Sequence, residues 1–103
     1  NYVGTIFGGS MYGAVDPIYM IMLIKRLGRD YIVWDREATI RFRRPGRDTL
    51  YARFRIDDGE IAAIRAALPD SGDRMDRTYT VDLTDDGGEV HATVEKVLYI
   101  RRK

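Results

Sequence analysis

Near its start the chain carries an apolar stretch that contains a single carboxylate, and few folds can accommodate such a segment. Asp16 is the only charged residue among the fourteen from Met11 to Ile24. We expect the first 28 residues to form a glycine-rich turn and then one long helix, which ends after two basic residues at Gly28. A helix that is apolar nearly all round is typical of a fully buried element.

Two interpretations of Asp16 stay open at this point. A carboxylate buried without partners is costly, so Asp16 needs either hydrogen-bond donors and cations or a proton, as functional carboxylates often do. Alternatively, Asp16 has a purely structural role. It would then cap a second helical segment that begins at Pro17, and Gly13 would leave room for the backbone to bend.

The composition is that of an ordinary globular domain and excludes several classes of site. At 103 residues, with 45% hydrophobic and 32% charged residues, the chain is expected to form one domain. The net charge of +1 gives no strong field for nucleic acid or membranes, so neither is an expected partner. The absence of cysteine excludes disulfides and fits a cytoplasmic location, and with a single histidine we expect no metal site.

Beyond Gly28 the hydrophobic period changes from that of a helix to that of strands. After a short β-rich run at Tyr31 to Trp34, residues 38–43 and 50–56 alternate and predict an antiparallel hairpin with one buried and one basic face. A short helix is expected from Glu60 to Leu68. Two further strands, 78–84 and 89–101, flank a turn at 85–88.

The last strand contains two polar residues of interest. Lys96 interrupts its inward-facing apolar set, and His91 is expected on the solvated face. Four strands are too few to surround a helix that is apolar all round. We therefore predict an α+β domain in which an antiparallel sheet curls around the first helix and a homodimer or homotetramer completes the cover.

The first residues also carry a motif, N-x-x-G-T-x-x-G-G followed by six residues and D. It resembles the active-site segment of hotdog-fold acyl-CoA thioesterases, most of all the phenylacetic-acid-degradation type. Tyr31 to Arg47 resembles a further branch of that superfamily, the DUF4442 domain. The resemblance implies a single hotdog domain over 1–103, with a long central helix wrapped by a curved antiparallel sheet. Because the chain starts inside the motif and without Met, we expect a natural N-terminal segment upstream of Asn1.

The resemblance also implies roles for individual residues. Asp16 of a neighbouring subunit would act on water as general base, or as nucleophile, and Asn1 would help to hold the substrate or the water. The Gly8 amide, at a helix N-terminus, would stabilise the oxyanion of the tetrahedral intermediate. The implied substrate contacts are Thr5, Phe7 and Gly9, together with Arg43 and Arg44.

The resemblance is incomplete at one position. Phe7 stands where these thioesterases usually carry histidine, and the related dehydratases also depend on an active-site histidine. Dehydratase chemistry is therefore disfavoured. The leading hypothesis is a thioesterase, and the alternative is a non-catalytic hotdog domain that binds acyl groups or serves in assembly.

Six arginines fall on or beside the predicted hairpin. One interpretation is a solvated face that also protects an edge strand. The other is a site for the phosphates of coenzyme A, which arginine binds well as a planar fork; coenzyme A would then be part of the substrate, with no separate cofactor. These arginines are Arg41, Arg43, Arg44, Arg47, Arg53 and Arg55.

Overall fold

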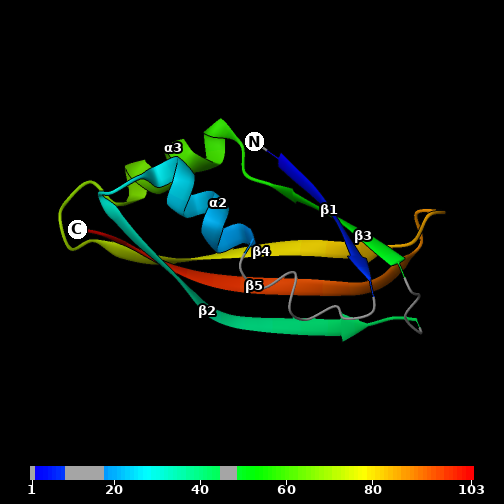
Figure 1. Cartoon of the computed structure of the whole chain (residues 1–103). Helices are drawn as coiled ribbons and strands as arrows, with labels where there is room; N and C mark the ends of the chain where they lie inside the picture. Colours follow the sequence, from blue (N-terminus) through cyan, green and yellow to red (C-terminus); the bar gives the residue numbers. More distant parts are fainter. Residues whose placement is uncertain (1, 9–17, 45–48) are drawn as a thin grey trace.

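The structure, a computed structural model, describes residues 2–8, 18–44 and 49–103. These residues form a five-stranded antiparallel sheet and two helices (Figure 1). The elements are β1 (Tyr2–Gly8), α2 (Ile18–Leu27), β2 (Tyr31–Phe42), β3 (Thr49–Arg55), α3 (Asp58–Ala67), β4 (Arg74–Thr84) and β5 (Val90–Arg102). The predicted α+β class is confirmed, with a curved antiparallel sheet against which α2 packs.

The strand order is β1-β3-β4-β5-β2, which differs from the predicted hairpin. β2 pairs with β5, from Tyr31 opposite Arg102 to Phe42 opposite Ala92, and not with β3. The prediction of a 38–56 hairpin was therefore wrong. With twelve and thirteen residues, β2 and β5 match in length, so their pairing satisfies more backbone groups than a pairing of β2 with the seven residues of β3.

The first residues also differ from the prediction. Tyr2–Gly8 is a strand, paired with β3 from Tyr2 opposite Arg55 to Gly8 opposite Thr49, and not a glycine-rich turn. Its β-branched and aromatic residues favour a strand wherever a partner is present. The prediction of a turn relied on the glycines of this segment. In the structure, pairing with the open edge of β3 determines its conformation.

Helix α2 buries one stripe, formed by Tyr19, Leu23 and Leu27 at intervals of four residues. Ile21 and Ile24 on the other side are 44% and 46% exposed in the single chain, and this is the side that the predicted oligomer would cover. The predicted end is confirmed. Gly28 has a φ of +82°, which suits glycine, and its amide donates to the Ile24 carbonyl at 3.1 Å. The predicted helical residues from Met11 to Pro17 lie outside the described residues.

Helix α3 is the predicted short amphipathic helix. Asp57 caps it by accepting a hydrogen bond from the Glu60 amide at 2.8 Å, and Ile61 and Ile64 are buried. At its other end, Arg65 donates to the carbonyls of Arg26 and Leu27 at 3.2 and 3.3 Å, so it satisfies the last turn of α2. The two helices and the sheet share one hydrophobic core.

Two neighbouring substitutions on α2 test this burial pattern. Leu23→Ala should lower the free energy of unfolding by about 2–5 kcal/mol, because it leaves a cavity in the core. Ile24→Ala should cost less than about 1 kcal/mol in a monomer, because it truncates an exposed side chain. Denaturant unfolding at several protein concentrations measures both. A loss at Ile24 as large as that at Leu23 would contradict the single-chain burial and indicate that a partner covers this face.

Candidate functional site

The described site residues of the motif lie along β1. Gly8 is its last residue, and Thr5 and Phe7 pair in register with Ala52 and Leu50 of β3. Gly8 belongs to a strand, and the residues that would place its amide at a helix N-terminus lie outside the described ones, so its predicted role stays a prediction. Three further predicted residues, Asn1, Gly9 and Asp16, lie outside the described residues.

Arg43 and Arg44 come to the same end of the sheet as Gly8. Their amides donate to the His91 carbonyl at 2.9 and 3.2 Å, directly after the end of β2. The ends of β1 and β2, the two edge strands, and the β4–β5 turn all lie toward this end of the sheet, on the right in Figure 1. The Arg44 guanidinium pairs with Glu89 at 2.8 Å, and both side chains are about half exposed, so this pair contributes about 0–1 kcal/mol.

The prediction that the six arginines form a single cluster was wrong. Because β4 and β5 lie between β3 and β2, Arg53 and Arg55 are separated from the arginines of β2. Arg55 instead pairs with Asp57 at 3.5 Å. Arg47 lies outside the described residues. Arg43 and Arg44 remain as a local basic pair at one end of the sheet.

An opening lies between β3 and β4. In the part of the chain that the structure describes, their register pairs Tyr51 with Thr84 and no other residues. The groove between them has a volume of about 1100 Å³, and it is lined on one side by Tyr51, Ala52 and Arg53 of β3. Thr80, Val81 and Asp82 of β4 and residues of the β4–β5 turn complete the lining. This volume is slightly above the range of about 300–1,000 Å³ that is usual for small-molecule pockets.

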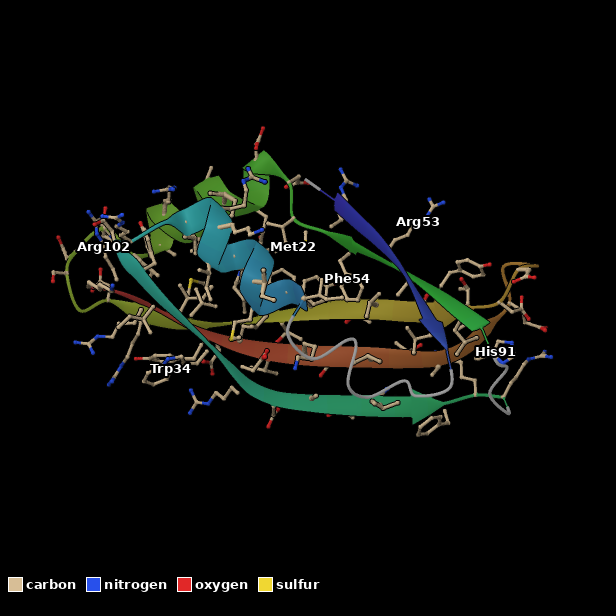
Figure 2. The ribbon with its side chains drawn as sticks, viewed as in Figure 1. Met22, Trp34, Arg53, Phe54, His91 and Arg102 are labelled. Atoms are coloured by element: carbon tan, nitrogen blue, oxygen red, sulfur yellow. The ribbon has the colours of Figure 1, made fainter. Side chains whose placement is uncertain are left out.

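The prediction that His91 lies on the solvated face was wrong. It is 4% exposed, and its Nε2 lies 2.8 Å from Asp85 Oδ2. The physical reason is a bulge: the register passes from Leu83 opposite Ala92 to Thr84 opposite Val90, so His91 is the extra residue on β5. Figure 2 shows His91 at the end of the sheet where the chain turns from β4 to β5.

Asp85 organises this turn. The pKa of Asp85 is lowered to about 2, mainly by its hydrogen bond with His91. The Glu89 and Gly87 amides also donate hydrogen bonds to it and lower the pKa further. Asp85, Glu89 and His91 place one potential metal ligand each within 4.8 Å of one another. Asp85 is hydrogen-bonded to His91, and Glu89 forms an ion pair with Arg44. The role of these side chains in closing the turn therefore explains their proximity.

A polar cluster that the sequence interpretation missed lies beside α2. Glu60 accepts hydrogen bonds from Arg77 Nε at 3.0 Å and from the Tyr79 hydroxyl at 2.5 Å. Burial favours a higher pKa for Glu60, but the hydrogen bonds from Arg77 and Tyr79 hold it below its ordinary value. The Tyr79 ring stacks on Tyr19 at 4.8 Å. Burial raises the pKa of Tyr19 to about 12 and that of Tyr79 as well, so both phenols are neutral at pH 7.

A second missed feature is a buried ion pair. Lys96 is 2% exposed, and its Nζ lies 3.2 Å from Asp35 Oδ1. Its place in the sequence was a signal, because the period-two pattern puts Lys96 on the same face as Val94 and Leu98. Lys96 therefore interrupts the inward apolar set, as predicted, without leaving that face. The structure keeps it in the row and supplies a carboxylate.

The fold is that of a known class. A crystal structure of PA5026 from Pseudomonas aeruginosa, a protein of unknown function described as a probable thioesterase, matches with a TM-score of 0.83. The match has 22% sequence identity and covers 99% of this chain and 77% of that chain. The curved antiparallel sheet, the packed helix and this likeness define a hotdog-like α+β fold.

The family follows from the sequence match. The family model described as Domain of unknown function (DUF4442) matches residues 1–100, so the chain belongs to the DUF4442 family. The resemblance stated from the sequence is confirmed in this respect. Among proteins with curated descriptions, none matches significantly. None of the helices in the described ranges has the length and apolar character needed to cross a membrane.

The Asp85–His91 contact predicts a pH dependence of stability. The lowered pKa of Asp85 means that its ionised form stabilises the fold above the ordinary carboxyl pKa, and that this contribution is lost as the pH falls toward about 2. Asp85→Ala should therefore be less stable than wild type from pH 5 to 7, and the difference should shrink between about pH 4 and pH 2. Denaturant unfolding over this range measures the difference. Asp86→Ala, at the neighbouring turn residue, is the control, and a difference independent of pH would contradict this role.

Proposed function

We propose that the protein hydrolyses an acyl thioester, with an acyl-CoA as the substrate class. The observation that carries the proposal is the structural likeness to a probable thioesterase over 99% of this chain. The glycine motif and Asp16 support it independently, because they supply the groups that thioester hydrolysis requires. Membership of the DUF4442 family is compatible with it.

In the proposed reaction, Asp16 takes a proton from water, and the oxygen of that water attacks the thioester carbon. A tetrahedral intermediate forms, and its oxyanion accepts a hydrogen bond from the Gly8 amide, a contribution of about 3–4 kcal/mol for one such donor. When the carbon–sulfur bond breaks, the thiol leaves with the proton and the acid is released. Asn1 holds the substrate or the water.

The proposed site is shared between the subunits of a homodimer or homotetramer. One chain supplies Asp16 and its neighbour supplies Gly8. The exposed apolar side chains Ile21 and Ile24 on α2 support an oligomer, because a second copy would remove them from water. The carboxylate and the oxyanion donor would then meet across the interface.

The proposed substrate position is the end of the sheet at which Gly8 of one edge strand and Arg43 and Arg44 of the other lie. The two arginines would bind the phosphates of coenzyme A. The groove between β3 and β4 reaches the β4–β5 turn at this end, and its volume of about 1100 Å³ can hold an acyl chain. Thr5, Phe7 and Gly9 would contact the thioester.

The second candidate function is acyl binding without hydrolysis. It is favoured by Phe7, because the aromatic side chain at this position lacks the acid–base capacity of histidine. This candidate shares the substrate class and the oligomer but not the turnover. Binding of acyl-CoA with no thiol release would establish it.

Thiol release from a panel of acyl-CoA substrates tests the leading proposal. We expect turnover by wild type and a loss of at least 100-fold in Asp16→Asn and Asp16→Ala, because these variants lack the base. Both should fold as well as wild type or better, because a costly charge is removed. Thermal unfolding and sedimentation are measured on the same samples. If Asp16→Ala unfolds or dissociates, Asp16 is a structural cap. If no substrate turns over above the Asp16→Asn rate, the protein is not a thioesterase.

The role of the basic pair is tested separately. Arg43→Ala/Arg44→Ala should raise KM for an acyl-CoA about 5- to 10-fold and leave KM for the matching acyl-pantetheine, which lacks the nucleotide phosphates, unchanged. Arg74→Ala, an exposed arginine at the opposite end of the sheet, is the control. Equal effects on both substrates would show that Arg43 and Arg44 do not bind the phosphates.

A further inference from the structure

The outer face of the sheet carries an exposed aromatic pair. Trp34 of β2 lies opposite Tyr99 of β5, and their rings stack with 5.5 Å between the centroids and 27° between the ring planes. Trp34 is 61% exposed in the single chain, and Figure 2 shows it on the side of the sheet away from α2. Tryptophan and tyrosine are among the residue types that most often carry the binding energy of protein–protein contacts.

This aromatic pair is held in position by a neighbouring ion pair. The Arg36 guanidinium lies 6.0 Å from the centre of the Tyr99 ring and donates to both carboxylate oxygens of Asp76, at 3.1 and 3.3 Å. Asp76 of β4 is opposite Tyr99 in the sheet, so Arg36 reaches across β5. Side chains that are ordered before binding lose less entropy when a partner binds. The outer face is therefore already arranged for a contact.

The outer row of β5 is complementary to itself when its direction is reversed. Glu95, Val97, Tyr99 and Arg101 follow one another at every second residue, so an acid, two apolar side chains and a base share one face. Glu95 and Arg101 are exposed, and the two residues between them are partly buried. If a second copy is laid on this row in the opposite direction, Glu95 meets the partner's Arg101 and Val97 meets the partner's Tyr99.

The two charges of this row have no counterion in their own chain. Neither Glu95 nor Arg101 forms an ion pair with another residue in the described ranges. Arg101 instead lies opposite Arg74 of β4, and like charges in directly opposite positions destabilise a sheet. A carboxylate from a second copy would offset this repulsion. The charge pattern thus favours a partner that brings an acid to Arg101 and a base to Glu95.

The face is also suited to a second sheet. The described helices α2 and α3 both pack on the inner face, and β5 is flanked by β4 and β2 (Figure 1). Two sheets pack face to face about 10 Å apart with their strands nearly aligned. Glutamate and arginine side chains from opposite sheets can meet across such a gap.

We propose that the outer face of β5, together with Trp34, binds a second copy of this chain face to face, about a two-fold axis that crosses β5 between Val97 and Tyr99. The exposed side of α2 lies on the other face of the sheet, so the two contacts are separate and can be present together. Of the two predicted oligomers, this arrangement gives the homotetramer. The inference goes beyond thioester hydrolysis and does not depend on it.

A charge-reversal experiment tests the register of this contact. Arg101→Glu and Glu95→Arg each place like charges across both halves of the two-fold interface, so each variant alone should raise the dissociation constant of the contact at least tenfold. When the two variants are mixed, every acid again faces a base. The mixed complex should therefore form with a dissociation constant within threefold of wild type. Sedimentation of the mixture, with one variant fluorescently labelled, measures it.

The recovery in the mixture cannot arise within one chain. Positions 95 and 101 are six residues apart on one strand, or about 20 Å, which is beyond the screening length of about 10 Å at 0.1 M salt. Arg29→Glu, at an exposed arginine in the turn before β2, makes the same change of charge as Arg101→Glu. This control should associate like wild type and should gain nothing from mixing with Glu95→Arg.

Trp34→Ala gives a second arm that does not depend on charge. It removes the largest side chain of the surface, so the dissociation constant of the contact should rise about 30-fold or more. Thermal unfolding of each variant, diluted until it no longer associates, should match that of wild type, because the changed side chains are exposed.

Three results would overturn the proposal. The first is a wild type that stays monomeric at micromolar concentration. The second is wild-type association in Trp34→Ala and Arg101→Glu, which would leave the outer face to another occupant, such as a peptide or a nucleotide. The third is a mixture of the charge variants that does not associate. A failure to release thiol from acyl-CoA bears on the proposed function alone and leaves this interface standing.

Discussion

The packing of the α2 stripe against the sheet is the interaction on which the rest of the structure depends. Tyr19, Leu23 and Leu27 are nearly inaccessible, and burying side chains of this size stabilises a fold by about 1.5–3 kcal/mol each. The sheet has to curve to meet a helix, and its inner rows supply the apolar partners. Phe54 of β3 is one of them. Its ring packs edge-on against that of Tyr19, with 5.1 Å between the ring centroids, and it lies between helix and sheet in Figure 2.

Much of this arrangement follows from local patterns in the sequence. The short helix that follows β3, the stop at Gly28 and the turn at 85–88 are short-range features, and each was predicted from the residues that form it. Strand pairing was not predicted correctly, because it depends on which distant segments have matching lengths and matching buried faces. The same limit explains the error at His91, since a single inserted residue reverses the side-chain alternation that follows it.

The candidate site could be predicted only in part, for a related reason. The motif identifies Gly8 and Asp16 as candidate site residues, but it contains no information on which strand lies beside them. The partners of a charge in the core come from elsewhere in the chain: Asp35 and Lys96 are 61 positions apart in sequence. Periodicity placed Lys96 on the inner face, but the carboxylate that meets it depends on a bulge in β2 and on the β2–β5 pairing.

The polar groups of the inner layer are distributed unevenly along α2. The half with Leu23 and Leu27 covers an apolar surface, whereas Tyr19 lies beside Tyr79, which leads to Glu60 and Arg77 and is adjacent in the sheet to Lys96. Buried charges contribute little net stability, because lost hydration offsets their attraction. A fold that needed only stability would fill both halves with hydrocarbon. The polar half is held by specific pairs, Lys96 with Asp35 and Arg77 with Glu60, which favour one arrangement of its side chains over others.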